Sequence, residues 1–315
     1  MAAKVFIDGE AGTTGLQIRE RLQARRDIEL VQIDPVRRKD EAARAEALNA
    51  AQVAILCLPD EAARAAVGLI SNNAVKVIDA STAHRTAPGW AYGFPEMSKS
   101  QRHVIAGAAR VSNPGCYPTA AIALIRPLVE AGVLPAAWPV TVNAVSGYSG
   151  GGRQMITDFE DQASAGFTRD AYRIYGLELA HKHVPEMQLH AGLEHAPLFA
   201  PAVGRFRQGM IVEVPLQLWA LPGCPRPADL HAVLADAYAG ERFVEVASAE
   251  QAAAAKTLDP EGLNGANRMR LYVFGNEARG QARLVALLDN LGKGASGAAV
   301  QNLNIMLGAD EGLGL

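Results

Sequence analysis

The chain has 315 residues, of which 49% are apolar and 20% charged, and its formal net charge is −3. The length predicts two domains or one large one, and the composition is ordinary for a globular protein. The charge gives no indication of nucleic-acid binding or of an anionic membrane surface, and no apolar run approaches a transmembrane length. Three cysteines make no disulfide framework and the N-terminus has no signal-peptide pattern, so we expect a cytoplasmic protein.

Residues 4–34 have the pattern that opens a dinucleotide-binding fold. An apolar strand at 4–8 leads into a glycine-rich turn, an amphipathic helix from Leu16 to about Arg25 and a strand at 28–33. Glycines at such a turn let the backbone approach a pyrophosphate at the helix N-terminus. We therefore predict a cofactor site, against the alternative of a plain turn, at Gly9, Gly12, Thr13, Thr14 and Gly15.

The residues after the second predicted strand bear on which dinucleotide is bound. Asp34 stands where an acid would hold the ribose diol of NAD, but Arg37, Arg38 and Lys39 follow at once. Guanidinium groups there can accept a 2′-phosphate, which favours NADP(H). The alternative is a solvated charged loop.

Strands and helices continue to alternate up to Asp79. We predict helices at 42–51 and 61–70 and strands at 53–59 and 75–79, with Cys57 as core packing. Such alternation indicates a parallel, doubly wound sheet. Ser81 follows the last of these strands, at the sheet edge where ligands bind, and is a further candidate cofactor residue.

The pattern changes after about residue 115. Strand-like runs at 140–145, 209–219, 270–274 and 283–288 have fewer helices between them, which predicts a second α+β domain with a mixed or antiparallel sheet. A helix at 296–307 ends the chain, and we expect it to return to the first domain. The predicted division is therefore a Rossmann-type domain of residues 1–115, completed by 296–315, and a catalytic domain of residues 116–295.

The segment Ser112–Thr119 carries the first candidate for chemistry. Cys116 lies in a Pro-Gly-Cys turn just before a predicted helix that runs from Thr119 to Leu128, with Pro118 suited to the first helical position. A helix N-terminus favours a thiolate and can hold an oxyanion. The bland alternative is a small buried hydrophobic residue.

A partner for this thiolate is offered by His181-Lys182-His183, with Pro185 and Glu186 just beyond. A cationic histidine lowers the pKa of a neighbouring thiol and can later donate a proton. The alternative is a surface His/Lys patch. A metal site is disfavoured because no third ligand is evident, so we predict none.

Two glycine-rich segments indicate anion or cofactor contacts. Residues 146–153 can present successive backbone N–H groups to an anion, and Arg153 can add a bidentate contact, unless the segment is only a flexible loop. Residues 289–302 combine a Gly-Lys-Gly turn with a small-residue helix, on which Asn302 could bond a nicotinamide amide. The alternative for this second segment is close helix packing.

These parts together fit one reaction type. A thiolate that attacks an acyl group gives a thioester, a hydride reduces that thioester to an aldehyde, and an anion site suits a phosphate leaving group.

Four motifs of the chain resemble those of the N-acetyl-γ-glutamyl-phosphate reductases. They are Ser-Asn-Pro-Gly-Cys-Tyr-Pro-Thr, Gly-Tyr-Ser-Gly-Gly-Gly-Arg, His-Lys-His-Val-Pro-Glu and Asp-Asn-Leu-Gly-Lys-Gly-Ala. The length and the segments at 79–86 and 92–96 resemble the shorter, type 2 form of that family. The resemblance covers nearly the whole chain, and the cysteine turn and the Gly-Lys-Gly segment are shared with aspartate-semialdehyde dehydrogenases.

The resemblance implies NADP-dependent reduction of N-acetylglutamyl 5-phosphate to the 5-semialdehyde in arginine biosynthesis, by a homo-oligomer, dimer or tetramer. It implies Cys116 as nucleophile and, from a His-Arg-His motif that reads His-Lys-His here, His183 as acid/base. We expect cofactor contacts also at Gly292, Lys293 and Asn302. The expected substrate and phosphate contacts are Asn113, Ser146, Gly147, Ser149, Gly150, Arg153 and His181.

Two other functions stay open from the sequence. One is a related semialdehyde dehydrogenase that acts on another acyl phosphate. The other is an NADPH-binding redox sensor without turnover, which would have no need for Cys116, His183 and Arg153 together. No nucleic acid or membrane partner is expected.

Overall fold

A computed structural model of the chain describes residues 2–315, which divide into two units with one sheet each. Unit 1 comprises the residues up to Pro95, Lys99–Gly115 and Ala295–Leu315, and unit 2 comprises Glu96–Ser98 and Cys116–Gly294. None of the helices described is long and apolar enough to span a bilayer.

Unit 1 is built on a parallel sheet with strand order β2-β1-β3-β4-β6-β5. Its strands are β1 (Ala3–Asp8), β2 (Ile28–Val31), β3 (Val53–Leu56), β4 (Lys76–Asp79), β5 (Ala91–Tyr92) and β6 (Arg110–Ser112), and its helices are α1 (Thr13–Leu22), α2 (Glu41–Ala50), α3 (Asp60–Gly68), α4 (Gln101–Gly107) and α10 (Gly297–Leu307). The predicted doubly wound sheet is confirmed. Because β1 lies between β2 and β3, the order of strands reverses at β1, and ligands of such sheets bind at that point.

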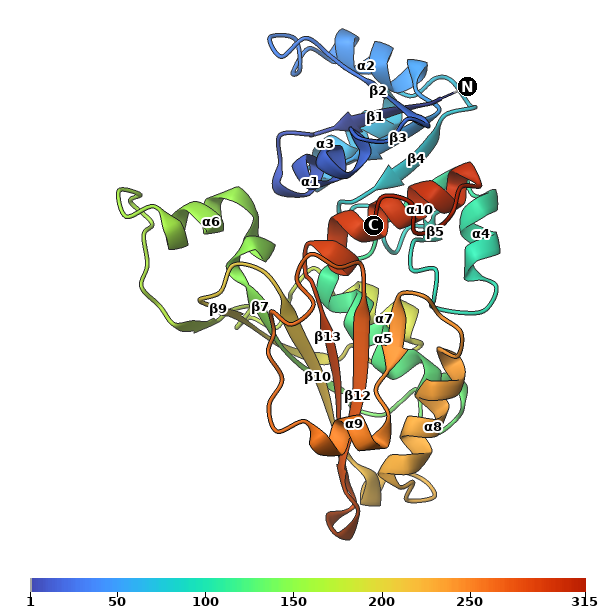
Figure 1. Ribbon diagram of the computed structural model, residues 1–315, viewed down its shortest axis with the longest axis vertical. Helices are drawn as coiled ribbons and strands as arrows, with labels where there is room; N and C mark the ends of the chain where they lie inside the picture. Colours follow the sequence, from blue (N-terminus) through green and yellow to red (C-terminus); the bar gives the residue numbers. More distant parts are fainter. Residues whose placement is uncertain (1) are drawn as a thin grey trace. The chain divides into compact units, whose positions relative to one another are not determined.

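The C-terminal helix α10 completes the core of unit 1, as predicted. Its Ala299, Val300, Leu303 and Met306 are buried in the same apolar cluster as Val5, Ile7 and Ile55 of the sheet. Figure 1 shows α10 beside α4, although about 190 residues separate them in sequence. The helix ends at Gly308, whose φ of 69° continues the chain in the left-handed region.

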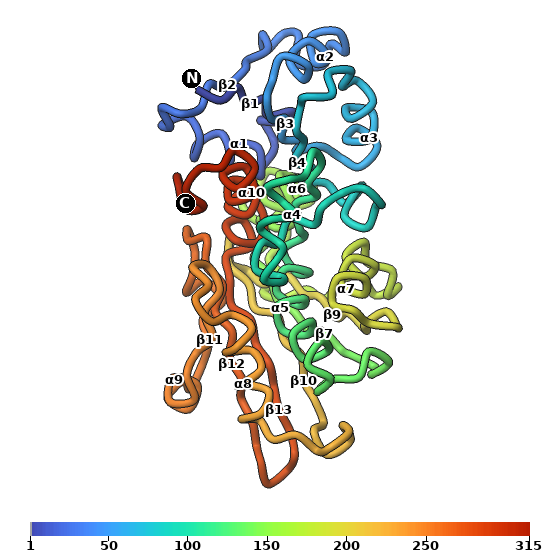
Figure 2. Tube along the Cα trace, turned by 90° about the vertical axis from the view of Figure 1, so that its right-hand side faces the viewer, coloured from blue at the N-terminus to red at the C-terminus, as the bar shows by residue number. Residues whose placement is uncertain are grey.

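Unit 2 contains a mixed sheet with strand order β11-β12-β13-β10-β7-β9-β8, as predicted. Its strands are β7 (Thr141–Gly147), β8 (Tyr172–Ile174), β9 (Leu198–Gly204), β10 (Met210–Gln217), β11 (Val244–Val246), β12 (Met269–Asn276) and β13 (Gln281–Leu288). Strand β13 pairs antiparallel along its whole length with β10 on one side and β12 on the other. Figure 2 shows these three strands as long neighbouring runs.

Helix α5 (Cys116–Glu130) is the central helix of unit 2 and packs on β10 and β13. The other helices of this unit are α6 (Gly152–Glu160), α7 (Val184–Ala191), α8 (Pro227–Ala237) and α9 (Ala249–Ala254). The start of α5 corrects our prediction, because Cys116 is the first helical residue and Pro118 the third. Proline is tolerated there because the first four N–H groups of a helix have no intrahelical acceptor.

Candidate active site

The glycine-rich turn between β1 and α1 leaves no room for side chains at two of its positions. Gly9 has a φ of 90°, and a Cβ atom there would overlap the carbonyl oxygen of Cys57. A Cβ atom at Gly15 would lie 2.5 Å from the Gly9 oxygen. Gly12 precedes α1 with extended backbone and no side-chain cap, so no capping side chain accepts from the first N–H groups of the helix, which starts at Thr13. The turn therefore has the form of a phosphate cradle.

The charged residues predicted to select NADP(H) lie on the surface of unit 1. Arg37 is half-exposed and its guanidinium lies 3.3 Å from the Asp40 carboxylate. A different ion pair, which the sequence did not reveal, lies closer to the turn. Arg44 of α2 donates to the carboxylate of Asp8, at the end of β1, with an Nη2–Oδ2 distance of 2.8 Å.

Ser81 holds a neighbouring carboxylate. Its hydroxyl donates to Asp79 Oδ2 at 2.8 Å, and its backbone N–H donates to Oδ1 of the same residue at 2.9 Å. His84, which sequence reasoning left without a role, lies with Nδ1 2.6 Å from Asp79 Oδ2 and stacks on Trp90 with ring centroids 4.1 Å apart. No spacing rule links these residues in the sequence.

Asn113, a predicted substrate contact, bonds to other residues of unit 1. Its Nδ2 donates to the Ala295 carbonyl at 3.0 Å, and its Oδ1 accepts from Asn302 Nδ2 at 3.1 Å. Its carbonyl oxygen also accepts from Arg85, so this buried side chain and its backbone hold the turn that ends at Gly115. The role of Asn113 as a substrate contact stays a prediction.

Asn302 retains one group that suits a ligand. Its Nδ2 donates to Gly93 and Asn113, while its buried Oδ1 has no hydrogen-bond partner among the described residues. A buried acceptor without a partner costs free energy, and an amide N–H donor from a ligand would satisfy it.

The candidate nucleophile begins the central helix of unit 2. Cys116 is half-buried at the first position of α5, where the backbone N–H groups of the first turn lack intrahelical partners. The chain at Gly294 passes so close that a Cβ atom there would lie 2.7 Å from the Cβ of Cys116. The next residue, Tyr117, connects the cysteine to the two histidines.

His181 and His183 lie side by side against Tyr117. The His181 and His183 ring centroids are 4.7 Å apart, and the Tyr117 ring lies 5.8 Å from His183 and 6.3 Å from His181. His183 is buried and caps α7, and its backbone N–H donates to Nδ1 of His181 at 3.1 Å. Burial, followed by the nearby charge of Lys182, lowers the pKa of His181. The sequence motif thus places both imidazoles beside the residue that follows Cys116.

Tyr175 belongs to the same cluster, although no sequence motif points to it. Its hydroxyl donates to the Tyr117 hydroxyl at 3.0 Å, and Tyr117 in turn donates to the Ala202 carbonyl. Burial raises the pKa of Tyr175 to about 12, and the negative charge of Cys116 adds to this rise. Tyr175 therefore stays a neutral donor at the edge of the site.

The glycine-rich segment 146–153 differs from the predicted series of anion-binding N–H groups. The N–H groups of Gly147, Tyr148 and Ser149 donate to the carbonyls of Gly209, Phe206 and Arg207. Further along the segment, the Gly152 N–H donates to the Ser149 carbonyl. The buried Ser146 hydroxyl donates to the Gly147 carbonyl, and the Ser149 hydroxyl accepts from Asn290.

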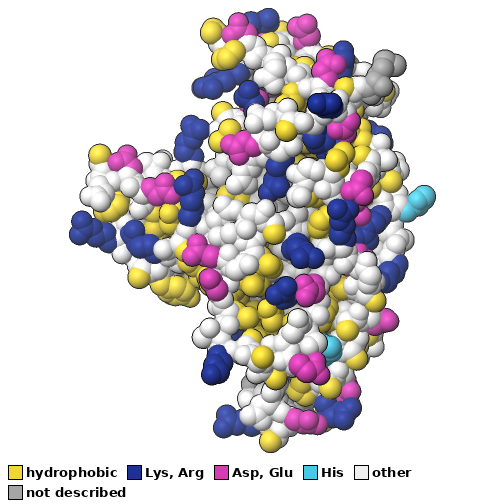
Figure 3. Space-filling view, in the orientation of Figure 1, with side chains coloured by type: hydrophobic (Ala, Val, Ile, Leu, Met, Phe, Trp, Pro, Cys, Tyr) yellow, Lys and Arg dark blue, Asp and Glu magenta, His cyan; other side chains and the backbone are white. Residues whose placement is uncertain are grey.

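Basic and acidic side chains lie together on the surface around α6 (Figure 3). The guanidinium groups of Arg205 and Arg173 lie 5.2 and 5.5 Å from the ring centroid of Phe159 on that helix. Arg153 itself is exposed near the helix start. Two arginines of this surface are paired with carboxylates, Arg173 with Asp170 at 2.9 Å and Arg207 with Glu160 at 3.4 Å.

Lys293, a predicted cofactor contact, is bonded to a carboxylate of unit 2, and its cofactor role stays a prediction. Its ammonium donates to both carboxylate oxygens of Glu96 at 2.8 Å, and both side chains are buried in unit 2. The preceding Gly292 is required for close packing, since a Cβ atom there would lie 2.5 Å from the Ala266 carbonyl. This segment serves the interior of unit 2 in ways that a Gly-Lys-Gly pattern does not reveal.

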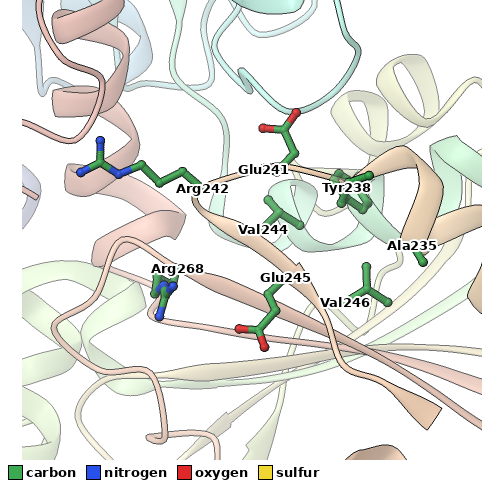
Figure 4. Close-up of a pocket in the computed structure, with 9 residues that line it drawn as sticks. Ala235, Tyr238, Glu241, Arg242, Val244, Glu245, Val246 and Arg268 are labelled. Atoms are coloured by element: carbon green, nitrogen blue, oxygen red, sulfur yellow. The ribbon is translucent and has the colours of Figure 1, made fainter.

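A separate groove of about 310 Å³ lies beside β11, and none of the predicted site residues lines it. Figure 4 shows Arg242, Glu245 and Arg268 among its lining side chains. The Glu245 carboxylate is paired with Arg270 at 3.1 Å. In residues 2–315, no three His, Cys, Asp or Glu side chains cluster as a metal site would require.

Comparison with known proteins identifies the two units. The model of the semialdehyde dehydrogenase NAD binding domain matches residues 4–106, and that of the semialdehyde dehydrogenase dimerisation domain matches residues 116–290. Among solved structures, aspartate semialdehyde dehydrogenase II from Vibrio cholerae, complexed with ASA, has the same fold, with a TM-score of 0.71, 14% identity and 98% coverage of each chain. Aspartate semialdehyde dehydrogenase with NADP from Candida albicans is similar at a TM-score of 0.61 and 13% identity, over 98% of this chain and 99% of that one.

Relatives of high sequence identity show which family of semialdehyde dehydrogenases the chain belongs to. The chain is 60% identical over 309 residues to an N-acetyl-γ-glutamyl-phosphate reductase of Chelativorans sp. (strain BNC1), covering 98% of this chain and 99% of that one. It is 57% identical to the enzyme of the same name from Brucella anthropi, with the same two coverages. The predicted family and the predicted nicotinamide dinucleotide cofactor are thereby confirmed. The chain belongs to the N-acetyl-γ-glutamyl-phosphate reductase family of the semialdehyde dehydrogenases.

Proposed function

We propose that this enzyme reduces N-acetyl-L-glutamyl 5-phosphate to N-acetyl-L-glutamate 5-semialdehyde with NADPH, releasing phosphate in a step of arginine biosynthesis, and that Cys116 is its nucleophile. The observation that carries the proposal is the placement of Cys116 at the first position of α5, followed by a tyrosine in ring contact with His181 and His183. A redox sensor without turnover would need no such acid/base pair beside its thiol.

The residues of unit 1 fit a bound dinucleotide. The turn at Gly9 and Gly15 is a cradle that Cβ atoms would fill, and the buried Oδ1 of Asn302 lacks a donor among the described residues. The backbone of the turn and of Thr13 and Thr14 holds the pyrophosphate, and Asn302 accepts from the carboxamide. Arg37 and Arg38 contact the 2′-phosphate. When bound, NADPH supplies the hydride that reduces the acyl group.

The residues of unit 2 carry out the acyl transfer. The Cys116 thiolate attacks the acyl carbon, so that a C–S bond forms and the C–O bond to phosphate breaks. His183, as imidazolium, stabilises the thiolate and gives its proton to the departing phosphate. His181 lies beside it, and Gly150 and Arg153 bind the phosphate. After reduction the C–S bond breaks, which releases the aldehyde and restores the thiolate.

The reverse reaction tests this assignment. The enzyme is mixed with NADP and N-acetylglutamate 5-semialdehyde, and absorbance at 340 nm is followed with and without phosphate. We expect a phosphate-dependent rise that Cys116→Ser abolishes and the matched control Cys224→Ser leaves unchanged. Full activity of Cys116→Ser would refute the nucleophile. A rise with aspartate semialdehyde in place of the acetylated substrate would instead support the related dehydrogenase activity.

We also infer that the enzyme is a homodimer in solution and that it works in the cytoplasm. Tyr172, Ile174, Leu177 and Leu179 are 59–72% exposed around a groove of about 380 Å³ in unit 2. Large apolar side chains gathered on a surface indicate an interface, and a second copy would bury them. Leu177→Asp should yield monomers in light scattering after size exclusion, whereas Val36→Asp, at the most exposed apolar position described in unit 1, should not.

A further inference from the structure

The short segment Asp289–Gly294, which follows β13, contacts two parts of the proposed active site. Asn290 is 2% exposed, and its Oδ1 accepts from the Gly209 backbone N–H at 2.7 Å. Its Nδ2 donates to the Ser149 hydroxyl at 3.1 Å, and a Cβ atom on Gly150 would lie 3.4 Å from the same nitrogen. Asn290 therefore joins the glycine-rich segment to strand β10.

The other end of this segment lies against the nucleophile. A Cβ atom at Gly294 would lie 2.7 Å from the Cβ and 3.2 Å from the Cα of Cys116. The Gly294 N–H donates to the Asp289 carbonyl at 2.9 Å, which closes the segment into a tight turn. Any side chain at this position would displace Cys116 or the turn.

Hydrogen bonds to the side chain of Asp289 hold the backbone of this segment in place. The buried Asp289 carboxylate accepts from the Leu291 N–H at 2.9 Å, the Gly265 N–H at 2.8 Å and the Gln208 amide at 2.5 Å. A carboxylate with three donors in the interior holds its backbone in one conformation. Asn290 and Gly294 are thus fixed relative to each other.

We propose that Asn290 and Gly294 position the phosphate site and the nucleophile relative to each other. Asn290 holds the Ser149–Gly150 part of the glycine-rich segment, and the backbone at Gly294 packs against the Cα and Cβ of Cys116. Both are positioning residues rather than catalytic ones, since neither touches the reacting atoms. The proposal rests on the proposed function of Cys116 and of the glycine-rich segment, and it assigns to residues 289–294 a role in unit 2.

The first test separates phosphate binding from chemistry. Asn290→Leu removes both hydrogen bonds, and we expect the KM for phosphate in the reverse reaction to rise about tenfold or more, since a small misplacement of a binding group is costly. Asn290→Asp can accept from both the Gly209 N–H and the Ser149 hydroxyl, so it should restore much of the affinity. Asn264→Leu, at an exposed asparagine that bonds the Gln208 carbonyl, is the matched control. An unchanged KM in Asn290→Leu would overturn this half of the proposal.

The second test reads the position of the thiol without substrate. In a Cys224→Ser background, Gly294→Ala should lower the alkylation rate of Cys116 and kcat by about tenfold or more, while NADPH affinity, which depends on unit 1, is retained and shows that the variant is folded. Gly107→Ala is the control, because a Cβ atom there meets nothing within 4 Å. Wild-type alkylation and kcat in Gly294→Ala would overturn the proposal. The Cys116→Ser assay tests the nucleophile separately, because alkylation reports the position of the thiol whether or not it is catalytic.

Discussion

The buried ion pair between Lys293 and Glu96 allows a sharp test of what stabilises unit 2. Their side chains are 1% and 0% exposed, the ammonium donates to both carboxylate oxygens, and it lies 5.6 Å from the centroid of the Phe243 ring. Lys293→Met keeps most of the side-chain volume but removes the ammonium that bonds both oxygens of the buried Glu96 carboxylate. The loss of a charged partner in the interior costs free energy.

The size of the effect follows from this burial. Removing one partner of a buried pair costs about 3–5 kcal/mol, whereas replacing both by apolar groups of similar volume is often neutral or stabilising. Against a total stability of about 5–15 kcal/mol, either single variant should lose a large part of its unfolding free energy. The double variant Lys293→Met/Glu96→Met should recover most of that loss.

Urea denaturation of the four proteins, followed by circular dichroism, completes a double-mutant cycle. The exposed pair Arg64–Glu61, with side chains 50% and 90% exposed, is the control and should show a coupling of at most about 1 kcal/mol. If the double variant is no more stable than the less stable single variant, the reasoning about the loss of one partner from a buried ion pair is wrong. If Lys293→Met is as stable as the wild type but binds NADPH more weakly, that result would support the predicted contact of Lys293 with the cofactor.

Three further predictions concern the turn, the histidines and the thiols. Gly15→Ala should weaken NADPH binding in fluorescence titration, because its Cβ would lie 2.5 Å from the Gly9 carbonyl oxygen, while Gly68→Ala, with nothing within 4 Å, should not. Because burial and Lys182 lower the pKa of His181, the unfolded chain takes up this proton first as pH falls below 6.5, so stability falls with pH in that range; Lys182→Gln should raise the pKa in NMR titration and reduce the loss. Burial and nearby carboxylates raise the pKa of Cys57 to about 12, so a thiol reagent at pH 8 should modify the other two cysteines and leave Cys57 unmodified until denaturant is added.

The sequence predicts the elements that depend on local pattern. The alternation of apolar strands and amphipathic helices up to Asp79 predicts the parallel sheet, and the apolar stripe at 296–307 predicts α10. Short elements lie beyond such reasoning, because β6 has three residues and β5 has two, too few for a period to show. Helix α4 is also short, and it packs on α10, which lies near the other end of the chain.

The site was predicted where local chemistry decides it and missed where distant partners do. A glycine-rich segment indicates available N–H groups, but the residues from Phe206 to Gly209 accept three of them. Lys293 in a Gly-Lys-Gly turn suggests a ligand contact, yet its partner Glu96 lies 197 residues away. Tyr175 shows the same limit, because only the fold brings its hydroxyl to Tyr117. In each of these cases, a polar group bonds to a partner that is distant in sequence.

The three cysteines show why placement, rather than residue type, decides reactivity in this chain. Cys57 follows β3 near the carboxylates of Asp8 and Asp79, and both burial and these charges disfavour its thiolate. Cys224 is exposed with a φ of 43°, and its Sγ donates to the Trp219 carbonyl. Cys116 alone among them begins a helix, where the first N–H groups have no intrahelical acceptor. The proposed role of Cys116 as nucleophile rests on this position, and the expected loss of activity in Cys116→Ser, with Cys224→Ser active, tests it.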